Sequence, residues 1–320
     1  MAKYRHGLPQ LGEGFFLADG GMETTLIFLD KLELPDFAAF QLLKNAEGIA
    51  ALRKYFRAYG AIARRYNAGL VLESATWRAS ADWAARLGFT HEALAAANRQ
   101  SIELLEAIRA EFESADTKVV ISGCVGPRGD GYSPAKLMSA EEAENYHGEQ
   151  IEVFATTAAD LVTAITLNYV EEAIGIVRAA RRCAMPVVIS FTIETDGVLP
   201  TGQSLRAAIE QVDAATSSYA CYYMINCAHP THFEKVLMTG EPWLERIRGL
   251  RANASRQSHA ELNESPDLDI GDPVELGAQY AQLKTNCLPQ LNVMGGCCGT
   301  DDRHVEEIAK ACAPLFDVKT

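Results

Sequence analysis

Short runs of apolar and β-branched residues recur along the whole chain, and each is about as long as one strand. Near-continuous hydrophobicity of this kind is typical of strands buried on both faces of a parallel sheet. Eight such runs occur, at Phe15–Gly21, Gly69–Ser74, Lys118–Cys124, Leu161–Leu167, Pro186–Ile193, Tyr222–Cys227, Ile247–Asn253 and Leu291–Cys297.

Amphipathic patterns with helical spacing lie between these runs. They predict helices over Asn45–Tyr66, His91–Phe112, Ala140–Ala159, Glu171–Cys183, Gly202–Thr216 and Pro273–Lys284. Ser139 with Glu142, and Asp302 with Glu306, stand where their side chains would assist capping at helix starts.

The repeated alternation of strand and helix predicts an α/β fold, namely a single (β/α)₈ TIM barrel. A doubly wound open sheet shows the same alternation, but eight units favour closure. No low-complexity linker or shift in composition divides the chain. We therefore expect one barrel domain over residues 1–320.

Composition narrows the class of protein further. The chain is 48% hydrophobic and carries a formal net charge of −13, without a cluster of Lys and Arg. This composition supports a large core and argues against nucleic acid or an anionic membrane as partner. No run approaches the about 20 apolar residues that span a bilayer, and residues 1–14 lack the apolar stretch of a secretory signal. We expect a cytoplasmic protein with small-molecule partners. Formation of a homo-oligomer is also possible.

Three of the eight cysteines share one end of the predicted barrel. Cys227 ends the sixth apolar run, and Cys297 and Cys298 end the eighth within a glycine-rich frame. Three thiolates with one vacant position make an open tetrahedral zinc site at the C-terminal mouth. His229 and His232 are rival ligands, although a role in positioning the loop is favoured. The remaining cysteines are expected to be small core residues: Cys124, Cys183, Cys221, Cys287 and Cys312.

A Zn²⁺ ion with three thiolates carries a formal charge of 2 − 3 = −1, so it activates water poorly and suits a soft ligand such as a substrate thiol. A thiolate held beside an electrophilic carbon is a nucleophile for alkyl transfer. Two alternatives stay open. The metal could polarise a substrate for hydrolysis or elimination, or the barrel could be a non-catalytic zinc- or thiol-binding protein.

Other strand ends offer candidate binding residues. Asp19 is followed by Gly20 and Gly21, whose N–H groups could approach a ligand closely. This pattern suits an amino-acid head, with Asp19 taking the ammonium and backbone donors taking the carboxylate; a helix N-cap is the competing interpretation. Glu23 is interpreted as a first-turn helix charge rather than a site residue. The polar stretch 253–272 is either a solvated loop or a lid over the mouth.

Together these residues resemble the zinc-dependent homocysteine S-methyltransferases, which include the betaine and S-methylmethionine enzymes and the homocysteine module of cobalamin-dependent methionine synthase. The matching segments run nearly end to end: LADGGMETTL, ATWRAS, GCVGPRGDGY, SFTIETDGVLPTGQSL, INC and GGCCGTDDRHVEEIA. The resemblance implies a (β/α)₈ barrel, zinc on Cys227, Cys297 and Cys298, and Asp19 with Gly20 and Gly21 in the acceptor pocket. Asn226, beside the first ligand, also matches.

The chain departs from the family pattern at the fourth strand. The family usually ends this strand in Glu-Thr, with the Glu holding the acceptor's ammonium, whereas Ile165 precedes Thr166 here. Loss of a carboxylate from a desolvated ammonium site is costly. Either another acid compensates, with Glu194 and Glu73 as candidates, or the acceptor is a different thiol.

The methyl donor is expected to be a small sulfonium or quaternary ammonium. No glycine-rich dinucleotide loop follows a strand, and the barrel leaves no room in the chain for a cobalamin or folate module. Trp77 and Tyr132 lie in mouth loops and could offer aromatic faces to such a cation. Anchoring of these loops is the competing interpretation.

Overall fold

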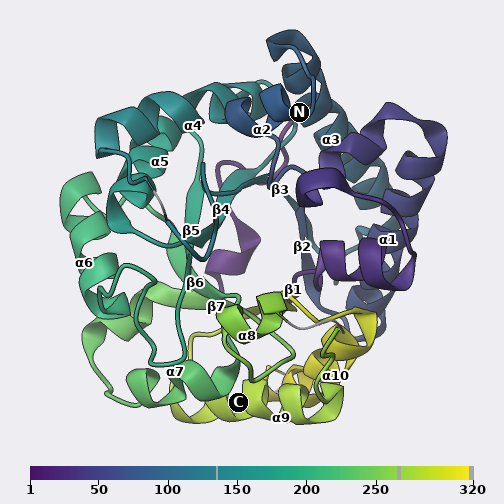
Figure 1. The fold of residues 1–320 in the computed structure, drawn as a ribbon. Helices are drawn as coiled ribbons and strands as arrows, with labels where there is room; N and C mark the ends of the chain where they lie inside the picture. The colour runs from purple at the N-terminus through teal and green to yellow at the C-terminus, as the bar shows by residue number, and fades with distance from the viewer. Residues whose placement is uncertain (135, 265–267, 317–320) are drawn as a thin grey trace.

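The strands of the computed structural model, which describes residues 1–134, 136–264 and 268–316, close into a barrel (Figure 1). Within these residues, neighbouring strands pair in parallel in the order of the sequence, and Phe16 of the first strand pairs with Gly69 of the second and Val293 of the eighth. The predicted closed barrel is confirmed, and the open sheet is excluded. The strands are β1 (Phe16–Leu17), β2 (Gly69–Glu73), β3 (Val119–Val125), β4 (Leu161–Leu167), β5 (Val187–Thr192), β6 (Tyr222–Asn226), β7 (Ile247–Ala252) and β8 (Val293–Gly296).

Helices form the outer ring around these strands (Figure 1). They are α1 (Ala46–Arg65), α2 (Ala81–Arg86), α3 (His91–Phe112), α4 (Ala140–Ala155), α5 (Val170–Arg182), α6 (Leu205–Thr216), α7 (Pro230–Leu237), α8 (His259–Glu264), α9 (Pro273–Asn286) and α10 (Asp302–Cys312). No helix in the described ranges has the length and apolarity needed to cross a membrane.

Local side-chain contacts explain where several helices begin. Ser139 and Glu142 form the expected reciprocal capping box at the start of α4. The predicted cap of α10 is one residue off: Asp301 is the N-cap, and its carboxylate accepts from the Arg303 N–H at 3.0 Å. Strand β1 is also shorter than predicted and covers only Phe16–Leu17, although Ala18 and Asp19 still share backbone hydrogen bonds with β8.

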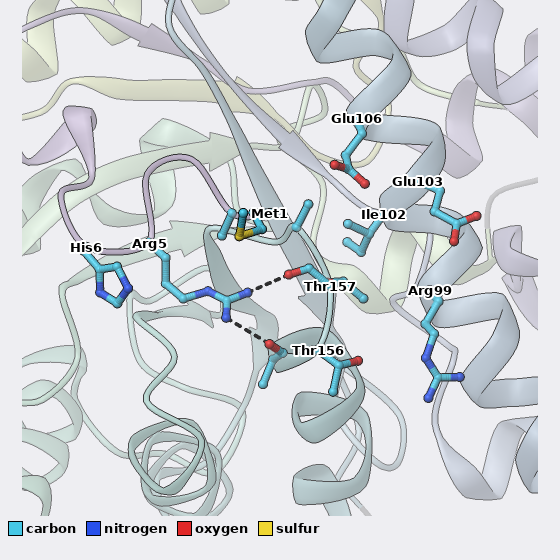
Figure 2. Close-up of a pocket in the computed structure, with 12 residues that line it drawn as sticks. Met1, Arg5, His6, Arg99, Ile102, Glu103, Glu106, Thr156 and Thr157 are labelled. Atoms are coloured by element: carbon cyan, nitrogen blue, oxygen red, sulfur yellow. Dashed lines mark hydrogen bonds between the residues drawn. The ribbon is translucent and has the colours of Figure 1, made fainter.

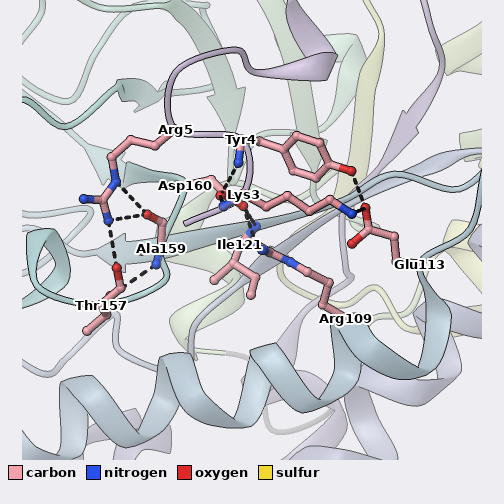
Figure 3. A network of polar contacts seen from close by, with 9 residues as sticks. All are labelled: Lys3, Tyr4, Arg5, Arg109, Glu113, Ile121, Thr157, Ala159 and Asp160. Atoms are coloured by element: carbon pink, nitrogen blue, oxygen red, sulfur yellow. Dashed lines mark hydrogen bonds and ion pairs between the residues drawn. The ribbon is translucent and has the colours of Figure 1, made fainter. Parts of the chain in front are cut away.

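The N-terminal segment is tied to the barrel by the buried carboxylate of Asp160 (Figure 3). One oxygen accepts from the backbone N–H groups of Lys3 and Tyr4, at 2.8 and 2.7 Å, and the other accepts from Ile121 N–H at 2.9 Å. Arg109 forms an ion pair with the same carboxylate. A buried charge is tolerated when it is paired and hydrogen-bonded in this way.

A hollow of about 560 Å³ lies between the N-terminal segment, α3 and the end of α4 (Figure 2). The Arg5 guanidinium points across it and donates to the carbonyl oxygens of Ala155 and Thr157, both at 2.9 Å. The end of α4 leads into the start of β4, so this hollow lies at the N-terminal end of the barrel. It is therefore remote from the chemistry, which barrels carry at the opposite end of their strands.

Candidate metal and thiol-binding site

Three cysteine sulfurs converge at the C-terminal mouth of the barrel. Cys227 follows β6, and Cys297 and Cys298 follow β8. Their Sγ atoms all lie within 4.8 Å of one another, and those of Cys227 and Cys298 are 4.0 Å apart. Tetrahedral zinc with Zn–S bonds of about 2.3 Å requires sulfurs about 3.8 Å apart. The donor set therefore fits a zinc ion after only a small contraction.

Asn226 sets the direction of the first of these sulfurs. Cys227 has a positive φ of 54° and Thr166 one of 68°, which turns the chain sharply where β6 and β4 end. The Asn226 side-chain amide donates to Thr166 Oγ1 at 2.9 Å and to Cys227 Sγ at 3.2 Å. Its carbonyl oxygen accepts from Thr166 N–H and from the Ser190 hydroxyl. Asn226 is fully buried and is not among the residues lining the cavity, so it positions the sulfur from behind.

Close packing of two glycine-containing turns fixes the other two sulfurs. A Cβ on Gly21 would lie 2.6 Å from the Cys297 carbonyl oxygen, so only glycine permits this approach. Gly299 has a φ of 79°, and its N–H donates to Thr24 Oγ1 at 3.0 Å. The loop after β8 is therefore built directly against the turn after β1.

A cavity of about 370 Å³ opens beside the cysteines. Cys227 is buried, Cys297 is half-buried and Cys298 is exposed. The cluster thus presents one side to the cavity and is closed on the other. Burial raises the pKa of the Cys227 thiol, so a cation must be bound for three thiolates to coexist here.

Aromatic residues and the segment 253–272 cover part of the mouth. The Tyr132 hydroxyl lies 3.3 Å from Cys227 Sγ and 3.5 Å from Cys298 Sγ. The Tyr132 ring stacks on His259 of α8, with centroids 4.2 Å apart. The cavity is also lined by Ser255, Leu262, Leu268 and Asp269. The described part of this segment therefore forms part of the cavity wall and is not only a solvated loop.

One face of each aromatic ring considered for the methyl donor is already covered. His259 covers one face of Tyr132, and the Arg78 guanidinium lies 4.1 Å from the Trp77 ring centroid. The Trp77 indole N–H donates to the Ile165 carbonyl oxygen at 3.2 Å. Trp77 thereby anchors its own loop to β4, which agrees with the competing interpretation.

The sequence suggests that Asp19 takes the ammonium of an amino-acid ligand, but in the structure its carboxylate already has partners within the protein. Arg251, on β7, places a guanidinium nitrogen 2.5 Å from Asp19 Oδ1, and the Tyr55 hydroxyl donates to Oδ2 at 2.9 Å. Both charged groups are buried. Gly20 and Gly21 line the cavity, but the Gly21 N–H points to Thr300, 3.1 Å from its hydroxyl and its carbonyl oxygen. That amide is not free for a ligand carboxylate, contrary to the expectation.

The two acids considered as replacements for the family's carboxylate, Glu73 and Glu194, lie in different places. Glu73 lines the cavity, and burial raises its pKa to about 7 although Arg251 opposes the shift. Glu194 follows β5 and is not among the residues that line the cavity; burial raises its pKa, with Asp196 and His232 as its charged neighbours. Glu23 stands in the first helical turn after the glycines, as expected, but it also lines the cavity, which the sequence did not predict.

The two histidines take the structural role that was favoured for them. His229 is the N-cap of α7, and His232 Nε2 lies 2.9 Å from the Arg256 carbonyl oxygen. Among the described residues, neither joins the group of three sulfurs. Of the five other cysteines, Cys124 and Cys312 are buried and the rest are half-buried; Cys124 also lines the cavity.

Sequence reasoning missed Arg251 and Arg78, the two guanidinium groups of the cavity. A signal was present for Arg251: a charged residue inside an apolar strand of a barrel must face a partner in the interior. For Arg78 no comparable signal exists, because a charged residue in a loop is ordinarily solvated.

Comparison with solved structures supports the same fold. The oxidized form of the homocysteine methyltransferase MmuM from Escherichia coli matches with a TM-score of 0.72 and 20% identity, covering 96% of this chain and 99% of that one. Its metallated form matches with a TM-score of 0.70 and 19% identity, covering 93% and 96%.

Sequence relatives point to one family. Betaine–homocysteine S-methyltransferase 1 from Rattus norvegicus is 26% identical over 194 residues, which cover 55% of this chain and 45% of the relative. The Bos taurus protein of that name is 25% identical over 194 residues. The chain spans about half the length of these relatives. The family model for homocysteine S-methyltransferase matches residues 16–312. The chain therefore belongs to the homocysteine S-methyltransferase family.

Proposed function

We propose that this barrel, as one domain over residues 1–320, is a zinc-dependent S-methyltransferase. It moves a methyl group from a small sulfonium or quaternary ammonium donor to a thiol, homocysteine or a related compound, and forms methionine if the thiol is homocysteine. The observation that carries the proposal is the convergence of Cys227, Cys297 and Cys298 beside a cavity. The names of the relatives and the metallated form of MmuM support it.

Cys227, Cys297 and Cys298 would hold the zinc ion, which would supply a soft Lewis acid able to lower the pKa of a substrate thiol. Asn226 assists by donating to Cys227 Sγ, which stabilises the negative charge of that ligand. The cavity then holds the acceptor sulfur in line with the donor methyl group. A bond forms between sulfur and the methyl carbon, the donor's own bond to that carbon breaks, and its electron pair neutralises the donor cation. The thiol proton leaves to solvent.

The cavity wall suits a methylated cation. Phe28, Phe37, Leu262 and Leu268 are among its apolar residues. Such a surface binds a cation whose charge is spread over methyl groups at a smaller desolvation cost than a compact ammonium, and the two phenyl rings add attraction through their faces.

Thermal unfolding of zinc-loaded protein, with and without homocysteine, tests the proposal. At a hundredfold excess over its dissociation constant, a ligand of the folded state adds about 2.7 kcal/mol. For 320 residues this corresponds to a rise in midpoint of about 4 °C. Methionine formed from homocysteine with betaine or S-methylmethionine is then measured by mass spectrometry.

Matched cysteine variants supply the control. Cys298→Ser should abolish the rise in midpoint, whereas Cys183→Ser, which changes a half-buried thiol outside the cluster, should retain it. A zinc-loaded wild-type protein that shows neither a rise nor methionine does not use homocysteine as its acceptor.

A further inference from the structure

The cavity beside the cysteines carries an unequal number of acidic and basic side chains. Asp19, Glu23 and Glu73 line it together with Asp130, Asp269, Arg78 and Arg251, so the formal charge of these seven side chains is 2 − 5 = −3. A cavity with an excess of carboxylates favours a ligand that brings a positive charge. The contacts of each acid decide which carboxylate meets that charge.

Asp130 and Asp269 line the cavity, but their hydrogen bonds lie within their own loops. Asp130 accepts from the backbone N–H of Tyr132 at 2.8 Å. Asp269 accepts from the Ser255 hydroxyl at 2.6 Å and from the Gly271 N–H at 3.0 Å. These carboxylates are stabilised by turn hydrogen bonds, and Asp130 also acts on the Arg78 guanidinium through its charge.

Asp19 is already neutralised. Its carboxylate lies between the Arg251 guanidinium and the Tyr55 hydroxyl, and only 2% of the residue is exposed. A ligand ammonium would have to displace Arg251, which is itself buried. Leaving that guanidinium without its partner is strongly unfavourable.

Glu73 is held deeper in the barrel. It is 4% exposed, its hydrogen-bonding neighbours are Ser122 of β3 and Thr163 of β4, and Arg251 is the opposite charge that acts on it. Its second oxygen has no hydrogen-bond partner in the described part of the chain and is closed off from solvent. Glu73 therefore shares Arg251 with Asp19, and it is less exposed than the half-buried Glu23.

Arg78 packs against two aromatic rings. Its guanidinium lies 4.1 Å from the Trp77 ring centroid and 3.8 Å from that of Trp83. One of its N–H groups donates to the Gly129 carbonyl oxygen at 3.0 Å. Arg78 thus lowers the pKa of Glu23 only through space.

Glu23 is the acid that these contacts leave facing the cavity. It is half-buried and follows the Gly20–Gly21 turn, which packs against the Cys297 carbonyl. The next residue, Thr24, accepts the N–H of Gly299, directly after the third cysteine. The Glu23 carboxylate is therefore carried on the same small assembly of turns as the sulfur cluster.

The geometry points to Glu23 as the residue that binds the ammonium group of an amino-acid thiol while the thiol's sulfur faces Cys227, Cys297 and Cys298. This inference rests on the proposed function and names the residue that selects an amino acid over a simple thiol. Ile165 also lines the cavity and contributes no charge. Burial raises the pKa of Glu23 to about 7, and a cation bound beside it would favour its charged form.

Binding of two thiols to zinc-loaded protein, measured by calorimetry, tests the inference. The probes are homocysteine and 4-mercaptobutanoate, which has the same carbon chain and carboxylate but no amino group. Wild-type protein should prefer homocysteine by at least about tenfold, and Glu23→Gln should remove most of that preference. The variant should bind 4-mercaptobutanoate as the wild type does, which shows that its site is intact. Glu194→Gln, an acid outside the cavity, is the matched control and should keep the preference.

Each other outcome has a definite meaning. An unchanged preference in Glu23→Gln overturns the assignment of Glu23 and leaves the proposed function standing. A wild-type protein that binds both thiols equally has no ammonium site, which overturns the inference alone. Failure of the zinc-loaded wild type to bind either thiol overturns the proposed function, and the inference with it.

Discussion

Replacing Glu73 by glutamine should make the folded protein less sensitive to rising pH. Glu73 is 4% exposed, and burial raises its pKa from 4.5 to about 7. The folded state therefore keeps this proton at pH values where the unfolded chain has released it. A carboxyl group with a raised pKa contributes stability below pH 4.5, and this contribution is lost as the pH rises through 7.

The size of the effect follows from the two pKa values. Between pH 5 and pH 8 the shift in Glu73 corresponds to a loss of about 2.5 kcal/mol in the free energy of unfolding. Glutamine has a similar shape and does not ionise, so the variant should lose correspondingly less stability over this range. Arg251 keeps Asp19 as its partner in the variant.

Urea unfolding at a series of pH values from 5 to 8 measures this difference. Wild type, Glu73→Gln and the surface control Glu245→Gln are compared at the same zinc content, so that the pH dependence of metal binding is common to all three. Glu245 is exposed, and its variant should follow the wild type. Parallel stability curves for wild type and Glu73→Gln would refute the reasoning, because the Glu73 carboxyl would then have the same pKa in the folded and the unfolded protein.

Two further substitutions test how the metal site is supported. Asn226→Ala removes the amide that contacts Cys227 Sγ at 3.2 Å, and zinc affinity should fall about 10- to 100-fold in a chelator competition; an unchanged affinity would show that the sulfur needs no support. Gly21→Ala places a methyl group 2.6 Å from the Cys297 carbonyl oxygen and should weaken zinc binding by moving that loop. Gly129→Ala, where a Cβ has no neighbour within 4 Å, should bind zinc normally, and equal affinities in both glycine variants would contradict the packing argument.

Much of the fold was encoded in local patterns. Every strand lies within, or within one residue of, an apolar run, because both faces of a barrel strand are buried and the sequence must be hydrophobic throughout. Short helices such as α2, α7 and α8 escaped prediction, since few residues carry too little periodicity to stand out. The convergence of the cysteines followed from topology alone, because the C-terminal ends of all the strands meet at one mouth.

The sequence by itself determined the barrel and the three sulfurs, and only the tertiary structure decided how the surrounding charges are paired. Asp19 follows β1 and Arg251 lies on β7, far apart in the chain, and their contact depends on closure of the barrel between β1 and β8. Glu194 stands at a strand end, yet it misses the cavity that Glu23 lines. Side-chain direction at a strand end depends on register and on the following turn, and a shift of a single residue reverses it. Side-chain direction therefore depends on the tertiary structure, whereas the identity of a metal-binding residue can be read from the sequence.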